Sequence, residues 1–264
     1  MQGFTLPVIP TGKKLDRTAK NVNRLSFLWY LFYPVGLCKI WKSRRKLLLK
    51  VLYSILYLPV FLVGFSCLAV VIFASFLKPL DRTVGVRTDR TIVNSEGNYA
   101  ATFIKTSADT HGEYELVQVE LEPNGGNDWH YHKDFEEQFT VLDGSVKIGR
   151  NGNEMLLKKG ETTIANREEM HFFKNARDQK SVLLVKVAPA AGLEKTLRVA
   201  YGLINDGLLK NDMTENPWHM ALLLGYSESY LQGLPSWFQE PLINSLAKIA
   251  QWKGEDKDLY RYFK

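Results

Sequence analysis

The sequence has 264 residues, of which 45% are hydrophobic and 23% are charged. These values are close to those of an average globular protein, and they exclude wholly disordered, collagen-like and coiled-coil classes. The net charge of +6 comes from the first fifth of the chain, since residues 1–50 carry +10 and the remaining residues carry −4. A nucleic-acid-binding domain needs positive charge on its folded body, so this distribution argues against nucleic acid as a partner.

Residues 51–77 form a run of 27 positions without a charged side chain. A helix needs about 20 apolar residues to cross the hydrocarbon core of a bilayer. The run has no polar face, unlike most core helices, and it begins too far from residue 1 for a signal peptide. Pro59 is compatible with a membrane helix, where neighbouring groups satisfy the freed carbonyl. The sequence therefore predicts a transmembrane helix over 51–77, with the lipid bilayer as its partner.

The basic residues before this run predict its orientation. Residues 41–50 read WKSRRKLLLK, and Lys and Arg accumulate on the cytoplasmic side of membrane helices. We therefore expect residues 1–50 to form a basic cytoplasmic segment and the chain after residue 80 to lie outside. A shorter apolar run at 25–38 is interpreted as an interfacial helix. If it crossed the membrane instead, the rest of the chain would lie in the cytoplasm.

Residues 85–190 read as short strands separated by turn signals. The predicted strands include 114–123, where Val117, Val119 and Leu121 share one face, and the runs 137–149, 155–160 and 181–189. Asp143-Gly144 and Asn151-Gly152 both favour type I′ hairpins, because the two central residues of that turn need positive φ. Many short strands with little helix between them predict a sandwich or a small barrel.

After Pro189 the hydrophobic period changes to that of helices, which are predicted at 193–208, 217–231 and 235–254, with Gly254 as a C-cap. Residues 191–264 are thus predicted to be a helical C-terminal extension. Its apolar stripe either packs on the barrel or lies on the membrane. Only Lys248 and Lys253 supply cations near the stripe, whereas a helix that binds acidic lipid is expected to carry more positive charge. The stripe is therefore expected to pack on the barrel. The stripe also offers a surface for a homodimer, although no residue demands one.

Three of the five histidines fall between residues 130 and 171. On a strand, His130 and His132 would point to one side, as would Glu137, Phe139 and Val141. A connection would bring Glu137 beside the two histidines, and His171 lies on another predicted strand. The only cysteines are Cys38 and Cys67, so a thiolate metal site is excluded after residue 78. Alternatively, the histidines could be structural and satisfied by hydrogen bonds in the core.

The spacing of these residues resembles the cupin superfamily. Its first motif, G-x5-H-x-H-x3,4-E-x6-G, is matched by His130, His132, Glu137 and Gly144, with Gly125 offset by one position. Its second motif, G-x5-P-x-G-x2-H-x3-N, is matched by Gly160, His171 and Asn175, while Asn166 and Glu168 replace its proline and central glycine. The resemblance implies a mainly β fold: a cupin-like double-stranded β-barrel, or jelly roll, preceded here by the transmembrane helix and followed by the helical extension. It also implies one metal ion held by the three histidines and the glutamate.

Three imidazoles and one carboxylate suit a divalent transition metal: Fe, Mn, Ni, Zn or Cu. Phe139, Val141 and Phe173 are candidates to line the cavity, and Asn175 to orient the loop that carries His171. Arg150 is expected to be solvated. By analogy with the fold, the chain is interpreted as a metal-dependent dioxygenase-like or isomerase-like enzyme acting on a small molecule. The alternative is a non-catalytic module that binds a small ligand or a metal, and the sequence leaves enzyme status open.

Overall fold

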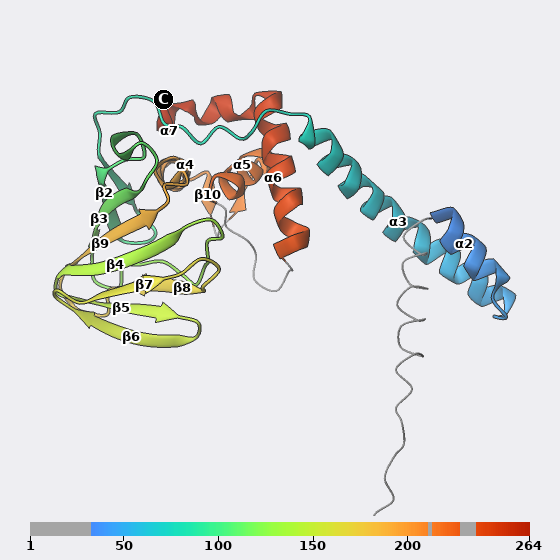
Figure 1. Cartoon of the computed structure of the whole chain (residues 1–264), viewed down its shortest axis with the longest axis horizontal. Coiled ribbons are helices and arrows are strands. Elements are labelled where there is room, and N and C mark those ends of the chain that lie inside the picture. Colours follow the sequence, from blue (N-terminus) through green and yellow to red (C-terminus); the bar gives the residue numbers. More distant parts are fainter. Residues whose placement is uncertain (1–32, 211–212, 228–235) are drawn as a thin grey trace, which may run out of the picture. The chain divides into compact units, whose positions relative to one another are not determined.

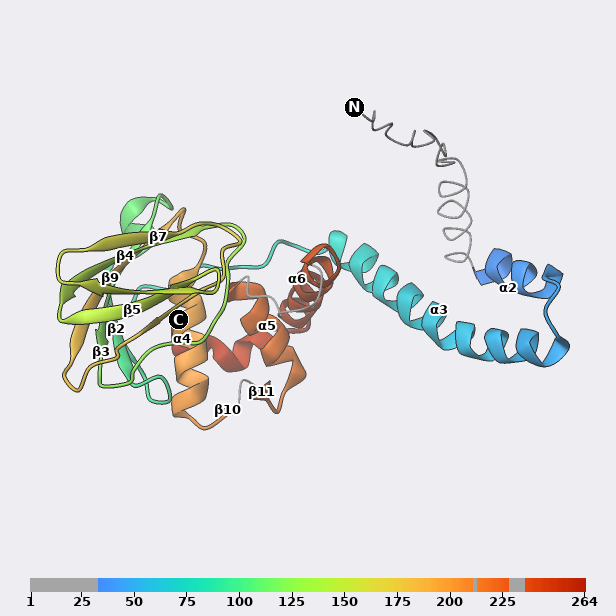
Figure 2. The same cartoon turned by 90° about the horizontal axis from the view of Figure 1, so that it is seen from below.

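The computed structural model describes residues 33–210, 213–227 and 236–264, and it divides the chain into two units, residues 1–68 and 69–264. Figures 1 and 2 show the described elements in two views. The first eight residues of the predicted interfacial helix 25–38 lie outside the described residues. So do the last four of the predicted helix 217–231.

The first unit contains helix α2 (Tyr33–Lys42) and most of helix α3 (Leu47–Ser75). Trp41 Nε1 donates to Ser54 Oγ at 3.2 Å and Lys50 Nζ donates to the Trp41 carbonyl at 2.7 Å, so the two helices are joined near their connection. Helix α3 starts four residues before the predicted segment and ends two residues before its end. It is long and apolar enough to cross a membrane, and its most apolar stretch is entirely unburied.

The second unit is built around two facing β-sheets (Figure 1). The larger sheet has the strand order β1-β2-β3-β9-β4-β7 and the smaller has the order β6-β5-β8. All of the strand pairs are antiparallel. The strands are β1 (Thr91–Asn94), β2 (Tyr99–Lys105), β3 (Glu115–Leu121), β4 (Glu136–Asp143), β5 (Ser145–Arg150), β6 (Asn153–Lys158), β7 (Thr162–Ala165), β8 (His171–Lys174) and β9 (Ser181–Ala188). This arrangement agrees with the expected jelly-roll-like fold.

Side chains of alternating residues fill the space between the two sheets. Along β3, Val117, Val119 and Leu121 are buried, as the alternation predicts, and Glu115 is buried on the same face. Along β4, the buried face carries Glu137, which therefore points inward together with its apolar neighbours at positions i+2 and i+4. The larger sheet thus brings one carboxylate of β4 into the barrel interior.

The two predicted type I′ turns have different outcomes. Asn151 and Gly152 have φ angles of 45° and 81° and connect the paired strands β5 and β6, which confirms that hairpin. The prediction for Asp143-Gly144 is wrong, since only Gly144 has positive φ and β4 is not paired with β5. Here the chain crosses from one sheet to the other. Gly144 suits the crossing, because a Cβ at this position would lie 2.5 Å from Ser181 Oγ.

The C-terminal part is helical, as predicted. Helix α4 covers Leu193–Asn205, and it lies between the barrel and the other helices: Leu197 and Tyr201 pack against the barrel core, whereas Val199 and Leu203 join a second apolar cluster. Gly254 has a φ of 82° directly after α6, as expected of a C-cap. The remaining elements are η2 (Ala108–Thr110), β10 (Leu209–Lys210), β11 (Met213–Thr214), α5 (Pro217–Ser227), α6 (Ser236–Lys253), η3 (Glu255–Leu259) and α7 (Tyr260–Phe263).

Candidate metal centre

The loop between β3 and β4 carries the first two histidines alongside strand β8. Asn127 N–H donates to the Phe173 carbonyl at 3.1 Å, and the Asn127 side chain accepts the Phe173 N–H at 2.9 Å. His130 and His171 exchange both backbone hydrogen bonds, at 3.0 and 2.8 Å. The expectation that His130 and His132 lie within a strand is therefore wrong in detail. They lie in a loop that is joined to β8 by isolated bridges, from Gly126 to Lys174 and from His130 to His171.

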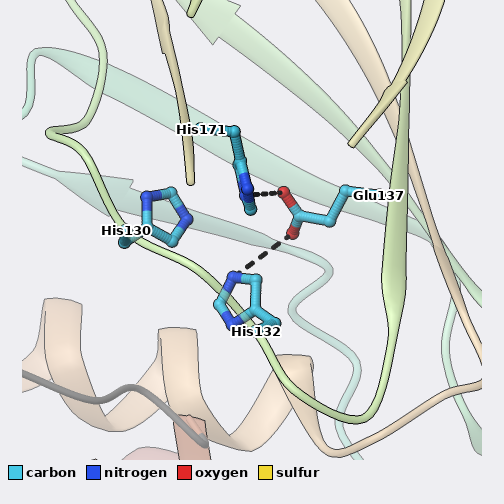
Figure 3. Close-up of side chains that lie close together, drawn as sticks. All are labelled: His130, His132, Glu137 and His171. Atoms are coloured by element: carbon cyan, nitrogen blue, oxygen red, sulfur yellow. Dashed lines mark hydrogen bonds and ion pairs between the residues drawn. The ribbon is translucent and has the colours of Figure 1, made fainter. Parts of the chain in front are cut away.

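Glu137 and the three histidines converge at this point (Figure 3). One ligand atom from each of the four residues lies within 4.8 Å of all the others. His171 Nε2 is 3.1 Å from Glu137 Oε2, and His132 Nε2 is 3.8 Å from Glu137 Oε1. Three of the four residues are buried and His130 is half-buried. Residues separated by up to 41 positions in the sequence thus share one small volume inside the barrel.

Two of the imidazole rings are oriented by hydrogen bonds to backbone carbonyls. His171 Nδ1 donates to the carbonyl of Glu169 at 2.7 Å, and His130 Nδ1 donates to that of Asp128 at 2.8 Å. A carbonyl can only accept, so each Nδ1 carries a proton and Nε2 is the atom that each ring turns toward the other site residues. This arrangement is typical of histidines that bind metals through Nε2.

The pKa values of the four residues reflect burial and their mutual contacts. Burial lowers the pKa of His132 to about 3, against the opposing effect of Glu137, and burial together with His171 also lowers the pKa of His130. Burial opposes ionisation of Glu137, but the His171 hydrogen bond and the nearby imidazoles outweigh it and lower its pKa to about 2. Burial also disfavours the charged form of His171, but the hydrogen bond and the charge of Glu137 outweigh it and raise the pKa of His171. Glu137 is therefore ionised and two histidines are neutral at pH 7.

An ion pair that the sequence did not predict supports the loop before His171. Arg150 Nε and Nη2 each lie 2.8 Å from a carboxylate oxygen of Glu169, and the same carboxylate accepts the Asn166 N–H at 2.9 Å. The backbone carbonyl of Glu169 is the group that accepts the His171 proton. The expectation that Arg150 is solvated is wrong, and no local pattern could have linked it to a residue 19 positions away.

Of the residues that were predicted to line the cavity or to orient His171, some lie near the histidines and others do not. The Phe139 ring lies 5.9 Å from the His171 ring and 6.1 Å from the Phe173 ring. Val141 is buried in the same core cluster. The Asn175 amide donates to the carbonyls of Leu121, Glu122 and Gln179, so it ties together the ends of neighbouring strands instead of contacting His171. Phe135, which the sequence did not single out, stacks on His132 at 4.2 Å.

The site has the donor set and the spacing that a divalent metal requires. A metal–nitrogen or metal–oxygen bond of about 2.1 Å places two ligands of one ion about 3 to 4 Å apart. The observed separations of up to 4.8 Å are close to this range. Two rings are oriented through Nδ1 and one carboxylate is ionised, so the residues fit such an ion.

The chain is similar to known proteins in the region of the β-sheets. Residues 117–187 match the family model of the cupin domain. No curated protein matches the chain. Solved structures that are similar include KdgF from Halomonas sp., with 15% identity over 40% of this chain and 92% of that chain and a TM-score of 0.34. Another is a predicted oxalate decarboxylase from Thermotoga maritima, with 17% identity over 43% and 97% of the two chains and a TM-score of 0.35. The family match supports a cupin domain in this chain.

Proposed function

We propose that the chain is a membrane-anchored cupin that binds one divalent transition metal through His130, His132, Glu137 and His171 and acts on a small molecule. The convergence of four ligand atoms within 4.8 Å of one another carries the metal-binding part of the proposal. Three neutral imidazoles and one carboxylate leave net positive charge on a divalent ion, and the set accepts Fe, Mn, Ni, Zn or Cu.

A bound ion would supply Lewis acidity at coordination positions that the protein leaves open. The residues of the chain prepare the site for it. Glu137 provides the negative charge, while the carbonyls of Asp128 and Glu169 orient the rings of His130 and His171. The contact with Glu137 holds the His171 ring at the site and raises the pKa of that imidazole. Phe135 and Phe139 border the rings and exclude water from that side.

The anchoring part of the proposal rests on helix α3. Its large apolar side chains are exposed along the helix, which is unfavourable in water but suits contact with lipid. The basic residues before it favour a cytoplasmic amino terminus, with the barrel on the opposite side of the membrane. A homodimer remains a prediction from the sequence.

Metal content of the purified full chain tests the proposal. We expect elemental analysis to find about one equivalent of a single transition metal in the wild type, given one four-ligand site. Glu137→Gln should lose most of it, since the variant removes the anionic ligand with little change of shape. Glu136→Gln is the matched control, because Glu136 is the exposed neighbour on the same strand. A wild-type protein that stays metal-free after reconstitution with each candidate ion would contradict the proposal.

Enzyme activity requires a separate test. Oxygen uptake and product formation are measured with flavonoid, thiol and keto-acid substrates. Turnover that disappears in Glu137→Gln but persists in Glu136→Gln supports an enzyme. A ligand-induced rise in melting temperature without turnover supports the non-catalytic module. Topology is tested with alkaline phosphatase fused after Lys264, which should be active if the barrel lies outside.

A further inference from the structure

Helix α6 has an aromatic face that is exposed in the second unit. We use this name for Trp237, Phe238 and Trp252, which are 75%, 45% and 64% exposed. With 3.6 residues per turn, Trp252 is rotated by about 60° from Trp237 and lies between the directions of Trp237 and Phe238. The opposite side of the helix, with Gln239, Ala247 and Ala250, is buried. One side of α6 thus packs on the protein while the other presents large aromatic rings.

The carboxyl end of this face adjoins the end of the apolar helix α3. The Trp252 ring contacts the Phe73 ring at a centroid distance of 5.5 Å, and Phe76, just after α3, is 83% exposed. Gln251 accepts the Asp81 N–H at 2.8 Å and donates to the Pro79 carbonyl at 3.4 Å. Helix α6 is therefore attached both to the last turns of α3 and to the residues that directly follow it.

The aromatic face lies beside the end of an apolar helix, which is a location that suits contact with the membrane–water interface. Tryptophan gathers where membrane helices meet water, because its ring is apolar and its N–H needs a polar partner. Phe73 lies within three residues of the end of α3, so Trp252 is at the level where that helix would leave the hydrocarbon. The acidic residue Glu240 of α6 is paired with Lys133, which removes an isolated negative charge from the helix.

We propose that the aromatic face of α6 lies in the headgroup region of the bilayer that α3 enters. The inference rests on the proposed membrane anchoring. It also reconciles the two expectations for the helical extension, since packing on the protein and contact with lipid involve opposite sides of α6. The Lys133–Glu240 pair joins α6 to the loop that carries His132.

Tryptophan quenching by brominated lipid tests the proposal with the full chain. Wild-type protein is reconstituted into phosphatidylcholine vesicles with or without bromine in the upper part of the acyl chains, and the quenched fraction of tryptophan emission is measured. The comparison variant is Trp237→Phe/Trp252→Phe, which keeps the face aromatic and removes only the two probes. Trp129→Phe is the matched control, because Trp129 lies on the barrel, where its ring packs against Phe172.

If the two tryptophans contact lipid, the quenched fraction falls in the double variant and rises in Trp129→Phe. An unchanged or higher fraction in the double variant would overturn the inference, including the case in which a second copy of the chain covers the face. Alkaline carbonate extraction of the same vesicles reads out the anchor separately. If the protein resists extraction but the double variant shows no fall in quenching, the membrane anchoring by α3 stands and only the proposed contact of α6 with lipid is refuted.

Discussion

Glu115 is a buried carboxylate that makes the stability of the barrel and helix α4 depend on pH. Its side chain is fully buried, Oε2 has no hydrogen-bond partner, and Oε1 accepts a long bond, at 3.5 Å, from the Glu194 N–H. Burial raises its pKa to about 7 from an ordinary value of 4.5, although backbone amides at the start of α4 act in the opposite direction. The folded protein therefore holds a proton at Glu115 that the unfolded chain releases above pH 4.5.

The sign of the pH dependence follows from this difference. A raised pKa of an acid means that its contribution to stability is fully present below pH 4.5 and is lost as the pH rises through about 7. A shift from 4.5 to about 7 corresponds to a loss of about 3 kcal/mol by pH 8. Glu115→Gln keeps the shape of the side chain and removes its charge. The variant should therefore be more stable than the wild type by about 3 kcal/mol at pH 8, and close to it at pH 4.

Thermal unfolding of the full chain in detergent, followed by circular dichroism, measures the effect. For a folded unit of this size, about 3 kcal/mol corresponds to a melting temperature about 6 to 12 °C higher at pH 8. Glu120→Gln is the control, since Glu120 lies on the same strand but is partly exposed beside Lys180. A Glu115→Gln variant that melts at the wild-type temperature at pH 8, or that gains equally at pH 4, would refute the assignment of a protonated Glu115.

Three further substitutions probe the fold and the site. Glu168 has a φ of 61° where the motif expects glycine, so Glu168→Gly should raise stability by about 0.5–1 kcal/mol in thermal unfolding; destabilisation would show that this backbone is not strained. Arg150→Ala removes the ion pair with Glu169 and should weaken metal affinity about 10- to 100-fold in a metal titration. The control Lys147→Ala breaks an exposed ion pair on the same strand and should leave the affinity unchanged. An Arg150→Ala variant that binds metal as tightly as the wild type would exclude a positioning role for Arg150. Leu222→Ala should cost about 2–5 kcal/mol in denaturant unfolding because Leu222 is fully buried among the helices, and a cost below 1 kcal/mol would contradict that packing.

Several features of this protein follow from local patterns in the sequence. The alternation of Val117, Val119 and Leu121 identifies the inward face of a strand, because successive side chains point to opposite sides of a sheet. Asn151-Gly152 predicts its hairpin because both residues tolerate positive φ. The uncharged run at 51–77 predicts a long apolar helix. The spacing of His130, His132, Glu137 and His171 predicts that the four side chains converge.

Other features depend on contacts between residues far apart in the chain, and only the tertiary structure decides them. Asp143-Gly144 has the composition of a hairpin turn, but β4 pairs with β9 and β7, so the same dipeptide serves a crossing between sheets. Nothing in the local sequence distinguishes Glu115 from an exposed glutamate, because its burial depends on the packing of helix α4. Arg150 becomes a support for His171 because β5 and β8 are neighbours. Local residue preferences are limited to a few neighbouring positions, whereas burial and pairing depend on which distant segments the packed core brings together.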